Sequence, residues 1–398
     1  MNADAIVVGA GPAGAATAIL LAEQGIKVLV LDRARLPRSK LCGEYLSPEA
    51  ARVLDRVGVL KTLDAAEAMP LRGMRITAPD GRVLVGSYRA IGDWRPYRDH
   101  ALAVPRRVLD GALAERLRAL PVDFREEMRV TDVLRDGDRV VGVVAVDAEA
   151  RSHVFHAPLV IGADGRASVV AHRLGCRHPH RLQRLALGTY VSGLVDCREY
   201  GEIFVDPPDY AILNPVTRDR VNLSVVVPLG HGSPWARRLD DFFDARVKQI
   251  PHLARRLAGA AREAVHALGP LAHRVTPPLV GGVMLVGDAA GFYDPFTGEG
   301  IFSALRGAEL AAATAVGALG AGDCSAAMLA GYERARRAAF ADKAVLTRIL
   351  QFVIRRRWAA NRCGRLLSRH PALLDALLGV IGDFVPPRAL LRPSAVSM

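Results

Sequence analysis

The 398-residue chain has few cysteines and aromatic residues and no long uninterrupted apolar run. Its five cysteines are an odd set without a Cys-x-x-Cys pair, which argues against a disulfide framework and against a zinc site. Arg306 and Glu309 interrupt the most apolar stretch, so no apolar run is long enough to cross a bilayer. The chain also begins without the basic region and cleavage site of a signal peptide, so we expect a cytoplasmic protein.

Several compact catalytic signatures are missing as well. The sequence has no His-Glu-x-x-His zinc motif, no Gly-x-Ser-x-Gly nucleophile motif and no phosphate-binding P-loop, and its 11 histidines are scattered. We therefore expect each histidine to be a surface or core residue and not a metal ligand.

Positive charge is concentrated near the end of the chain. The net charge is +12, and residues 331–370 alone hold 11 basic and two acidic residues. Aromatic residues are only 6% of the chain and do not alternate with these basic residues, so nucleic acid is not an expected partner. Because apolar residues recur at helical spacing in the same segment, we predict either membrane contact through residues 334–369 or helices with a solvated arginine face.

Apolar patterning predicts an α/β fold with two sheets. In the first half of the chain the pattern indicates strands, helices and a hairpin over residues 5–8 (strand), 12–24 (helix), 27–31 (strand), 106–120 (helix), 128–147 (hairpin) and 158–162 (strand). Later stretches predict an antiparallel sheet from residues 185–194, 201–205, 210–216 and 221–227, joined by 74–88. Helical spacing returns over 235–265, and a strand over 283–286 precedes a mostly helical remainder from Gly300 onward.

A glycine-rich motif follows the first predicted strand and opens the first helix. Its sequence is Gly9-Ala10-Gly11-Pro12-Ala13-Gly14, and this context is what a dinucleotide fingerprint requires. Gly11 lets a pyrophosphate approach the backbone, and Gly14 lets the helix pack closely on the strand. Asp32 ends the second strand, where its carboxylate would hold ribose hydroxyls. The motif predicts a bound dinucleotide and leaves NAD and FAD as alternatives.

Two further motifs distinguish these alternatives. Gly162-Ala163-Asp164-Gly165 and Gly287-Asp288-Ala289-Ala290-Gly291 each place an aspartate at the carboxyl end of a strand. Together with the first motif, in this order, they resemble the flavoprotein monooxygenase and geranylgeranyl reductase superfamily, which has the fold of p-hydroxybenzoate hydroxylase. The resemblance covers roughly residues 1 to 320.

The resemblance implies a Rossmann-like, discontinuous FAD-binding domain with an inserted antiparallel sheet domain and C-terminal helices. We expect the FAD-binding domain to comprise residues 1–73, 101–176 and 277–330. The substrate domain would comprise 74–100 and 177–276, and a basic helical region would comprise 331–398.

The resemblance also implies which residues bind the cofactor. Cys42, in Lys40-Leu41-Cys42-Gly43, would lie near the flavin ring and is the candidate catalytic residue. The expected FAD-binding residues are Gly9, Gly11, Pro12, Ala13, Gly14, Asp32, Arg33, Lys40, Cys42, Gly43, Arg106, Val130, Asp164, Gly165, Gly287, Asp288, Pro295, Gly298, Glu299, Gly300 and Ile301. Tyr210 and Pro215 match the substrate-domain motif Tyr-x-Trp-x-Phe-Pro-Lys of geranylgeranyl reductases, from which residues 210–216 otherwise depart.

The motifs leave the reaction open. The residues around Cys42 and the sequence Thr297-Gly298-Glu299-Gly300 favour a reductase of an isoprenoid- or polyketide-like substrate. The altered substrate motif favours hydroxylation of an aromatic or lipid-like substrate. A carrier without catalysis is a third alternative, against which the intact glycines and aspartates argue. The Trp-x-Trp-x-Ile-Pro motif of tryptophan-type halogenases is absent. Because no second Gly-x-Gly-x-x-Gly motif occurs, electrons would come from transiently bound NAD(P)H or from a protein donor.

Overall fold

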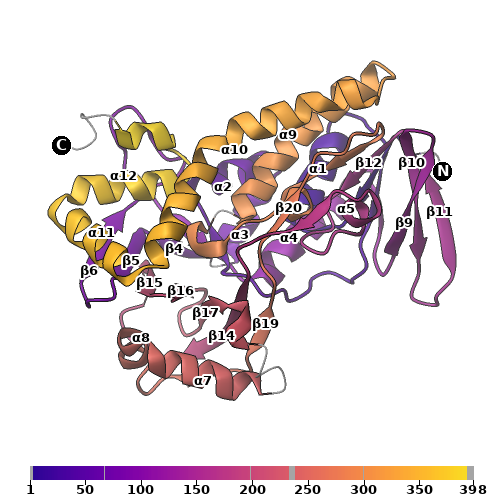
Figure 1. Cartoon of the computed structure of the whole chain (residues 1–398). Helices are drawn as coiled ribbons and strands as arrows, with labels where there is room; N and C mark the ends of the chain where they lie inside the picture. Colours follow the sequence, from indigo (N-terminus) through magenta and orange to yellow (C-terminus); the bar gives the residue numbers. More distant parts are fainter. Residues whose placement is uncertain (1–2, 67, 198, 233–237, 299, 392–398) are drawn as a thin grey trace.

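A five-stranded parallel sheet lies at the centre of the larger unit of the computed structural model (Figure 1). The structure describes residues 3–66, 68–197, 199–232, 238–298 and 300–391. All four neighbouring pairs in this sheet run parallel. Its strands, in spatial order, are β21 (Val283–Leu285), β12 (Leu159–Gly162), β1 (Ala5–Val8), β2 (Val28–Leu31) and β8 (Asp123–Arg125). Because the strands are parallel, their carboxyl ends meet at one edge, where ligands of α/β sheets bind. The predicted βαβ unit is therefore confirmed.

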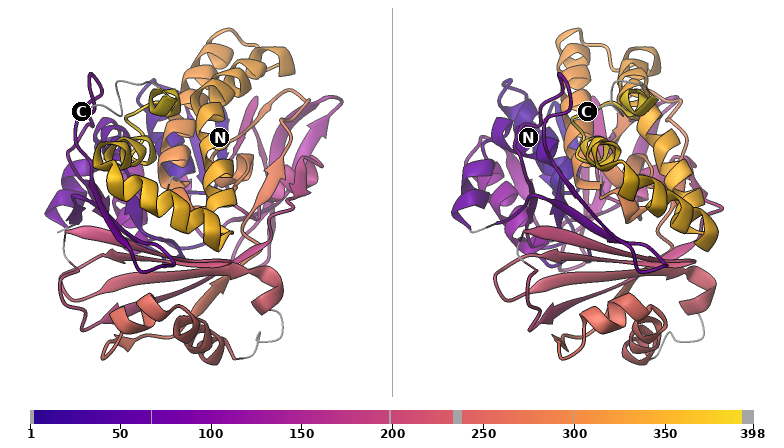
Figure 2. Two further views of the ribbon diagram at one scale, coloured as in Figure 1. Left: turned by 60° about the vertical axis from the view of Figure 1, so that its left-hand side comes forward. Right: turned by 90° about the vertical axis from the view of Figure 1, so that its left-hand side faces the viewer.

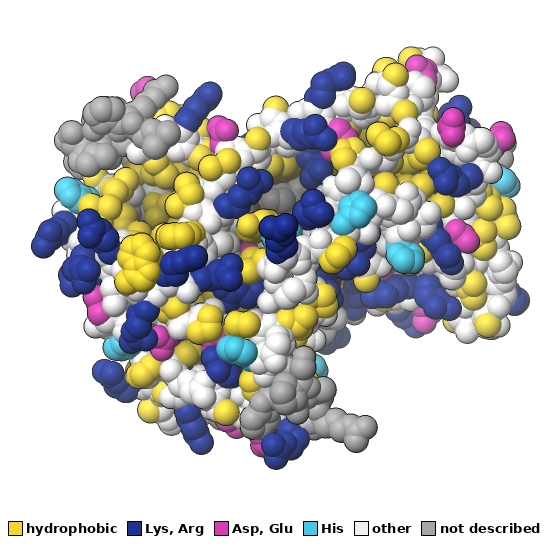
Figure 3. All heavy atoms as spheres, in the orientation of Figure 1, with side chains coloured by type: hydrophobic (Ala, Val, Ile, Leu, Met, Phe, Trp, Pro, Cys, Tyr) yellow, Lys and Arg dark blue, Asp and Glu magenta, His cyan; other side chains and the backbone are white. Residues whose placement is uncertain are grey.

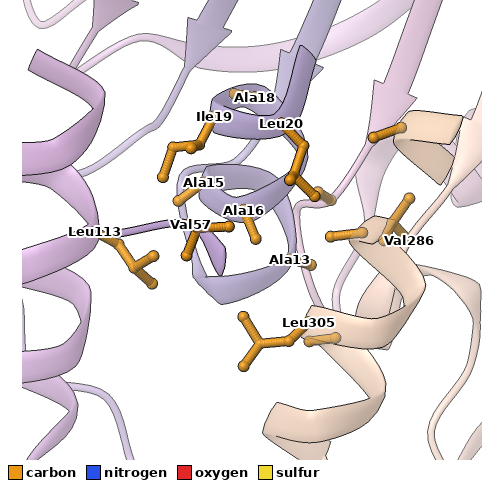
Figure 4. Close-up of a cluster of buried hydrophobic side chains, with 14 of the residues drawn as sticks. Ala13, Ala15, Ala16, Ala18, Ile19, Leu20, Val57, Leu113, Val286 and Leu305 are labelled. Carbon is orange, nitrogen blue, oxygen red and sulfur yellow. The ribbon is translucent and has the colours of Figure 1, made fainter. Parts of the chain in front are cut away.

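Helices cover one face of this sheet. They are α1 (Pro12–Ala22), α2 (Pro48–Arg56), α3 (Leu60–Ala65), α4 (Arg106–Arg118) and α9 (Gly300–Gly320). Every residue of α1 is buried, because the helix lies between α4 and α9 as well as on the sheet. In Figure 4, small side chains of α1 lie between Leu113 of α4 and Leu305 of α9. The alanine-rich sequence of α1 thus allows close packing on several sides at once.

A second layer covers the other face. It is a three-stranded antiparallel sheet of β9 (Arg129–Asp136), β10 (Arg139–Val146) and β11 (Ser152–His156), with α5 (Val169–Arg173) beside it. The hairpin predicted over 128–147 is confirmed by β9 and β10, whose turn contains Gly137 with a φ of 53°. This layer brings Val130 to the carboxyl edge of the central sheet.

The second large sheet has eight strands and lies at the lower side of Figure 1. Its main path is β18 (Ala261–Arg262), β14 (Arg184–Ser192), β17 (Val221–Pro228), β16 (Asp209–Pro215), β15 (Tyr200–Asp206), β5 (Gly73–Thr77) and β6 (Val83–Ser87), and β19 (His266–Leu268) also pairs with β14. Residues 74–88 join it as predicted. The predicted antiparallel arrangement holds except at one pair, because β15 and β5 run parallel.

Helices cover both faces of this second sheet (Figure 2). On one face lie α7 (Leu239–Gln249) and α8 (Pro251–Arg256), which give way to strand β18 within the stretch predicted as helical over 235–265. On the other face lie the C-terminal helices α10 (Ala326–Ile354), α11 (Arg357–Arg369) and α12 (Pro371–Ile381). Residues 235–237 of the predicted helical stretch lie outside the described residues.

The sequence pattern does not predict several short elements of the structure. They are β3 (Tyr45–Leu46), β7 (Ala101–Ala103) and β4 (Met69–Leu71) in one small sheet, the pair β13 (Arg177–Pro179) and β20 (His273–Val275), the helix α6 (Leu229–Gly232), and the 3-10 turns η2 (Gly287–Ala290), η3 (Pro295–Thr297) and η4 (Pro387–Leu391). Among the described residues, no helix combines the length and the apolar character needed to cross a membrane.

Candidate cofactor and substrate site

A cavity of about 780 Å³ lies between the carboxyl edge of the central sheet and the second sheet. Of the predicted cofactor residues, Gly14 and Gly287 do not line it, and Glu299 lies outside the described residues. The others line this one cavity: Gly9, Gly11, Pro12, Ala13, Asp32, Arg33, Lys40, Cys42, Gly43, Arg106, Val130, Asp164, Gly165, Asp288, Pro295, Gly298, Gly300 and Ile301. Residues from four separate parts of the sequence therefore converge on a single site.

The glycine motif combines close packing with open space. A Cβ at Gly14 would lie 1.8 Å from the carbonyl oxygen of Gly9, so only glycine permits this turn of α1. A Cβ at Gly11 would meet no atom within 4 Å, and the backbone there is accessible from the cavity. This space at the amino end of α1 suits a pyrophosphate, which the free N–H groups and the helix dipole would stabilise.

Asp32 fixes the shape of the loop beside this motif. Its Oδ2 accepts a hydrogen bond from the Ala10 N–H at 2.7 Å, and its Oδ1 accepts from the Ala34 N–H at 2.8 Å and from Arg38 Nη1 at 3.0 Å. The side chain is 2% exposed. A carboxylate oxygen has two lone pairs, so Oδ2 keeps capacity for a ribose hydroxyl.

Two other aspartates present oxygen atoms at the cavity. Oδ2 of Asp164 accepts hydrogen bonds from Val169 N and Val170 N, whereas its buried Oδ1 has no partner among the described residues. Burial raises the pKa of Asp164. Asp288 lies in η2 and lines the cavity, and no hydrogen bond to its carboxylate is found in the described part of the chain. Both side chains therefore offer acceptors to the hydroxyl groups of a bound cofactor.

Cationic groups lie near these carboxylates. Desolvation lowers the pKa of Lys40, and the neighbouring Arg106 lowers it further, while Asp288 opposes this change. The Arg106 guanidinium is buried and donates to both oxygens of Asp110 at 3.0 and 2.9 Å. It also lies beside the Cys42 thiol, so Arg106 holds positive charge next to this loop.

The loop before α9 is held by a buried aspartate. Oδ1 of Asp294 accepts from the Phe296 N–H at 2.9 Å and from the Tyr210 hydroxyl at 2.7 Å. Gly298 has a φ of 66°, and a Cβ there would lie 2.7 Å from the ring of Tyr45. These contacts direct the amino end of α9, with its positive dipole, toward the cavity. A flat, electron-rich ring could lie against this turn.

Residues of three strands of the second sheet clamp the Cys42 loop (residues 40–44), and two of these strands, β14 and β17, do so through Glu44. Its carboxylate is 2% exposed and accepts from Arg106 N at 2.7 Å, from the Tyr190 hydroxyl at 2.8 Å and from Asn222 Nδ2 at 3.1 Å. Asn222 Nδ2 also donates to the Cys42 carbonyl at 2.9 Å, and Asn214 Nδ2 donates to the Gly43 carbonyl at 2.7 Å. Burial raises the pKa of Glu44, although these donors oppose the change. No sequence motif links the strands to the loop, so this clamp could not be predicted from the sequence.

The part of the cavity beside the second sheet is mostly apolar, although Asn214 and Ser224 also line it. It is lined by Met74, Ala186, Ile203, Ile212, Val226, Leu268, Leu271, Phe292, Phe296, Leu378 and Ile381, from the second sheet, α12 and the loops between them. Tyr210 and Pro215 do not line it. Tyr210 is fully buried against Phe296, with ring centroids 5.1 Å apart, and Pro215 alternates to the opposite face of β16 from Ile212.

The residues present therefore suit FAD, because the open backbone at Gly11 and the free acceptors of Asp164 and Asp288 match its pyrophosphate and its hydroxyl groups. Residues 2–347 match the protein family described as "FAD binding domain". The chain belongs to this family. It is an FAD-dependent oxidoreductase of the flavoprotein monooxygenase and geranylgeranyl reductase superfamily.

Curated relatives of this FAD enzyme include two kinds of reductase. The menaquinone reductase of Mycolicibacterium smegmatis is 30% identical over 332 residues, which are 78% of this chain and 76% of the relative. The digeranylgeranylglycerophospholipid reductase of Methanothrix thermoacetophila is 30% identical over 351 residues, 84% of this chain and 83% of the relative. A solved structure of the flavin-dependent brominase Bmp2 has a TM-score of 0.85 at 21% identity and covers 98% of each chain, which shows the shared fold.

Replacing Asp288 by alanine is expected to weaken FAD binding about 10- to 100-fold, because a charge-assisted hydrogen bond to the cofactor would be lost. Fluorescence titration of the apoprotein with FAD measures the effect. Asp219→Ala, in the exposed turn between β16 and β17, is the matched control and is expected to bind FAD as the wild type does. Equal affinities for all three proteins would contradict the assignment.

Replacing Asp294 by asparagine is expected to change how stability depends on pH. Burial raises the pKa of Asp294, and its Oδ2 lacks a partner among the described residues. The neutral carboxyl is favoured in the fold, so its stabilisation is present at low pH and is lost as pH rises through the raised pKa. The melting temperature of Asp294→Asn minus that of the wild type should therefore increase as the pH rises from about 4 to about 7. A constant difference across this range would refute the prediction.

Proposed function

We propose that the protein reduces a carbon–carbon double bond in an isoprenoid-like hydrophobic compound. The observation that carries this proposal is the continuity of the cavity, in which the cofactor residues and the apolar walls formed by Ile203, Ile212 and Leu378 line one space. An apolar chamber favours an apolar substrate, since burial of its surface stabilises the complex. The names of the reductases at 30% identity, which refer to menaquinone and to a geranylgeranyl lipid, agree with this substrate class.

The chain contributes binding, orientation and exclusion of water. FAD, when bound, supplies the two-electron chemistry that amino-acid side chains lack. The aspartates and glycines of the central sheet would hold its polar parts, and the Cys42 loop would border its ring. The apolar walls would keep the substrate beside that ring and keep bulk water out. Electrons would come from NAD(P)H bound transiently or from a protein donor.

Oxygen insertion is the second candidate function. It is favoured by the sequence of residues 210–216, which keeps only Tyr210 and Pro215 of the geranylgeranyl reductase motif. Such a departure in β16 changes the wall against which the substrate would lie. An aromatic or lipid-like compound would then be hydroxylated in the same cavity.

One experiment separates the two candidates. The FAD-loaded enzyme is reduced with dithionite and incubated with menaquinone or with a geranylgeranyl lipid, once without oxygen and once with it. A product that is formed without oxygen and is still heavier by two hydrogen atoms after exposure to air would support reduction of a double bond, because menaquinol made by dithionite itself reoxidises to menaquinone. A product heavier by one oxygen atom, formed only with oxygen, would overturn it in favour of hydroxylation. Stopped-flow mixing with NADPH and with NADH would then test the electron donor.

A further inference from the structure

The C-terminal helices expose an unusual set of apolar side chains. Val345, Ile349 and Phe352 of α10, with Trp358 and Leu366 of α11, are each between 48% and 63% exposed. Phe352 and Trp358 pack edge to face across the bend between the helices, with ring centroids 6.3 Å apart. We call these five residues the α10–α11 patch. The contact between Phe352 and Trp358 joins the parts of the patch that lie on the two helices.

The patch lies opposite the side by which α10 packs on the protein. Val345, Ile349 and Phe352 follow the spacing i, i+4, i+7 and therefore share one face of the helix. Leu350 and Ile354 are buried against the second sheet and lie on the opposite face. The apolar residues of α10 thus form two stripes, and only one of them packs against the rest of the protein.

The charge around the patch is mostly positive, although the exposed Asp342 lies one helical turn before Val345. The exposed arginines Arg348, Arg355, Arg356, Arg362, Arg365 and Arg369 flank it, and none of them has a salt bridge in the described part of the chain. Glu333 and Asp342 are the only acidic residues of α10 and α11, and Glu333 pairs with Arg336. In Figure 3, dark-blue Lys and Arg side chains gather across this face with yellow apolar side chains among them.

We propose that the α10–α11 patch docks the protein on the surface of an anionic lipid bilayer. The apolar side chains would enter the boundary between headgroups and acyl chains, where tryptophan is favoured, and the arginines would meet lipid phosphates. A second copy of this chain fits less well, since two strongly basic surfaces would repel each other. The proposal does not depend on the reaction that the enzyme catalyses.

Co-sedimentation with vesicles tests the role of charge. The FAD-loaded full chain should sediment with vesicles of equal parts phosphatidylglycerol and phosphatidylcholine at low salt, and much less with phosphatidylcholine alone or at high salt. The double variant Arg362→Gln/Arg365→Gln should bind about 25-fold more weakly, at about five-fold per arginine. Arg135→Gln/Arg218→Gln, two exposed arginines of other surfaces, is the matched control and should bind as the wild type does. Arg357 is left unchanged, because it bonds to Asp206 and to the Pro79 carbonyl.

Fluorescence tests whether the patch enters the lipid. Brominated phosphatidylglycerol should quench part of the tryptophan emission, and this quenching should disappear in Trp358→Phe. Ile349→Ser should weaken vesicle binding, whereas Leu279→Ser, an exposed apolar residue elsewhere, should not. The proposal is overturned by absent vesicle binding at low salt, by equal losses in patch and control variants, or by quenching that persists without Trp358. It is also overturned if Trp358→Ser instead dissociates a dimer of the wild-type protein.

Discussion

Replacing Gly14 by alanine is expected to destabilise the protein and to abolish its retention of FAD. The added Cβ would lie 1.8 Å from the Gly9 carbonyl oxygen, and both atoms belong to the tightest part of the glycine motif. Backbone cannot yield as a flexible side chain can, so α1 would have to move away from the central sheet. Every residue of α1 is buried, and overpacking of this kind costs about 1–3 kcal/mol. Thermal unfolding of the apoprotein and the FAD content of the purified protein measure the two effects.

Gly11→Ala is expected to weaken FAD binding at the same motif without changing the stability of the protein. Its Cβ would meet no protein atom within 4 Å, and the residue has an ordinary φ of −70°. We therefore expect the melting temperature of the apoprotein to remain that of the wild type. FAD affinity should nevertheless fall by about tenfold or more, because the Cβ would occupy the approach of the pyrophosphate. Wild-type FAD affinity in Gly11→Ala would contradict the placement of the pyrophosphate beside this residue.

The sequence predicted those parts of the site that are encoded in short segments. Gly9 to Gly14, Asp164 and Asp288 each belong to a motif of four to six residues at the end of a strand. Parallel pairing brings the ends of such strands together whatever the length of the chain between them. The motifs therefore predicted both the central sheet and the residues that line its carboxyl edge.

The second sheet contributes contacts that no short segment encodes. Glu44 meets Tyr190 and Asn222 across 146 and 178 positions of sequence. Asn214 and Asn222 are paired neighbours on β16 and β17. The sequence of a strand, however, does not show which residue the side chain of an asparagine will contact. Alignment to a family motif pointed to Tyr210 instead, whose hydroxyl supports the Asp294 loop from below the cavity surface.

Helical spacing alone also could not assign the faces of α10. Leu350 and Ile354 meet the second sheet, while Ile349 and Phe352 are exposed on the other side of the same helix. In the sequence these four residues look like members of one apolar set. Only the position of the second sheet decides which of them are covered.

Replacing Glu44 by alanine is expected to cost about 2–4 kcal/mol of stability and to loosen the Cys42 loop. The change would leave the Arg106 N–H and the Tyr190 hydroxyl without their acceptor and would remove one of the two bonds of Asn222 Nδ2. Burial already raises the pKa of Glu44, so part of the loss is offset by removing an unfavourable buried charge. Chemical denaturation measures the free energy of unfolding, and alkylation of Cys42 measures the loosening, which should make the thiol react faster.

Glu127→Ala is the matched control for this change. Glu127 has a φ of 57°, close to the 54° of Glu44, but its side chain is exposed and makes no hydrogen bond within the described part of the chain. Both substitutions therefore change a glutamate in the same left-handed backbone region, and only one removes the clamp. Tyr190→Phe should fall between them, because it removes a single donor and leaves the carboxylate held by Arg106 N and Asn222. If Glu44→Ala and Glu127→Ala lose equal stability and leave Cys42 equally reactive, backbone strain explains the result and the clamp has no role in holding the loop.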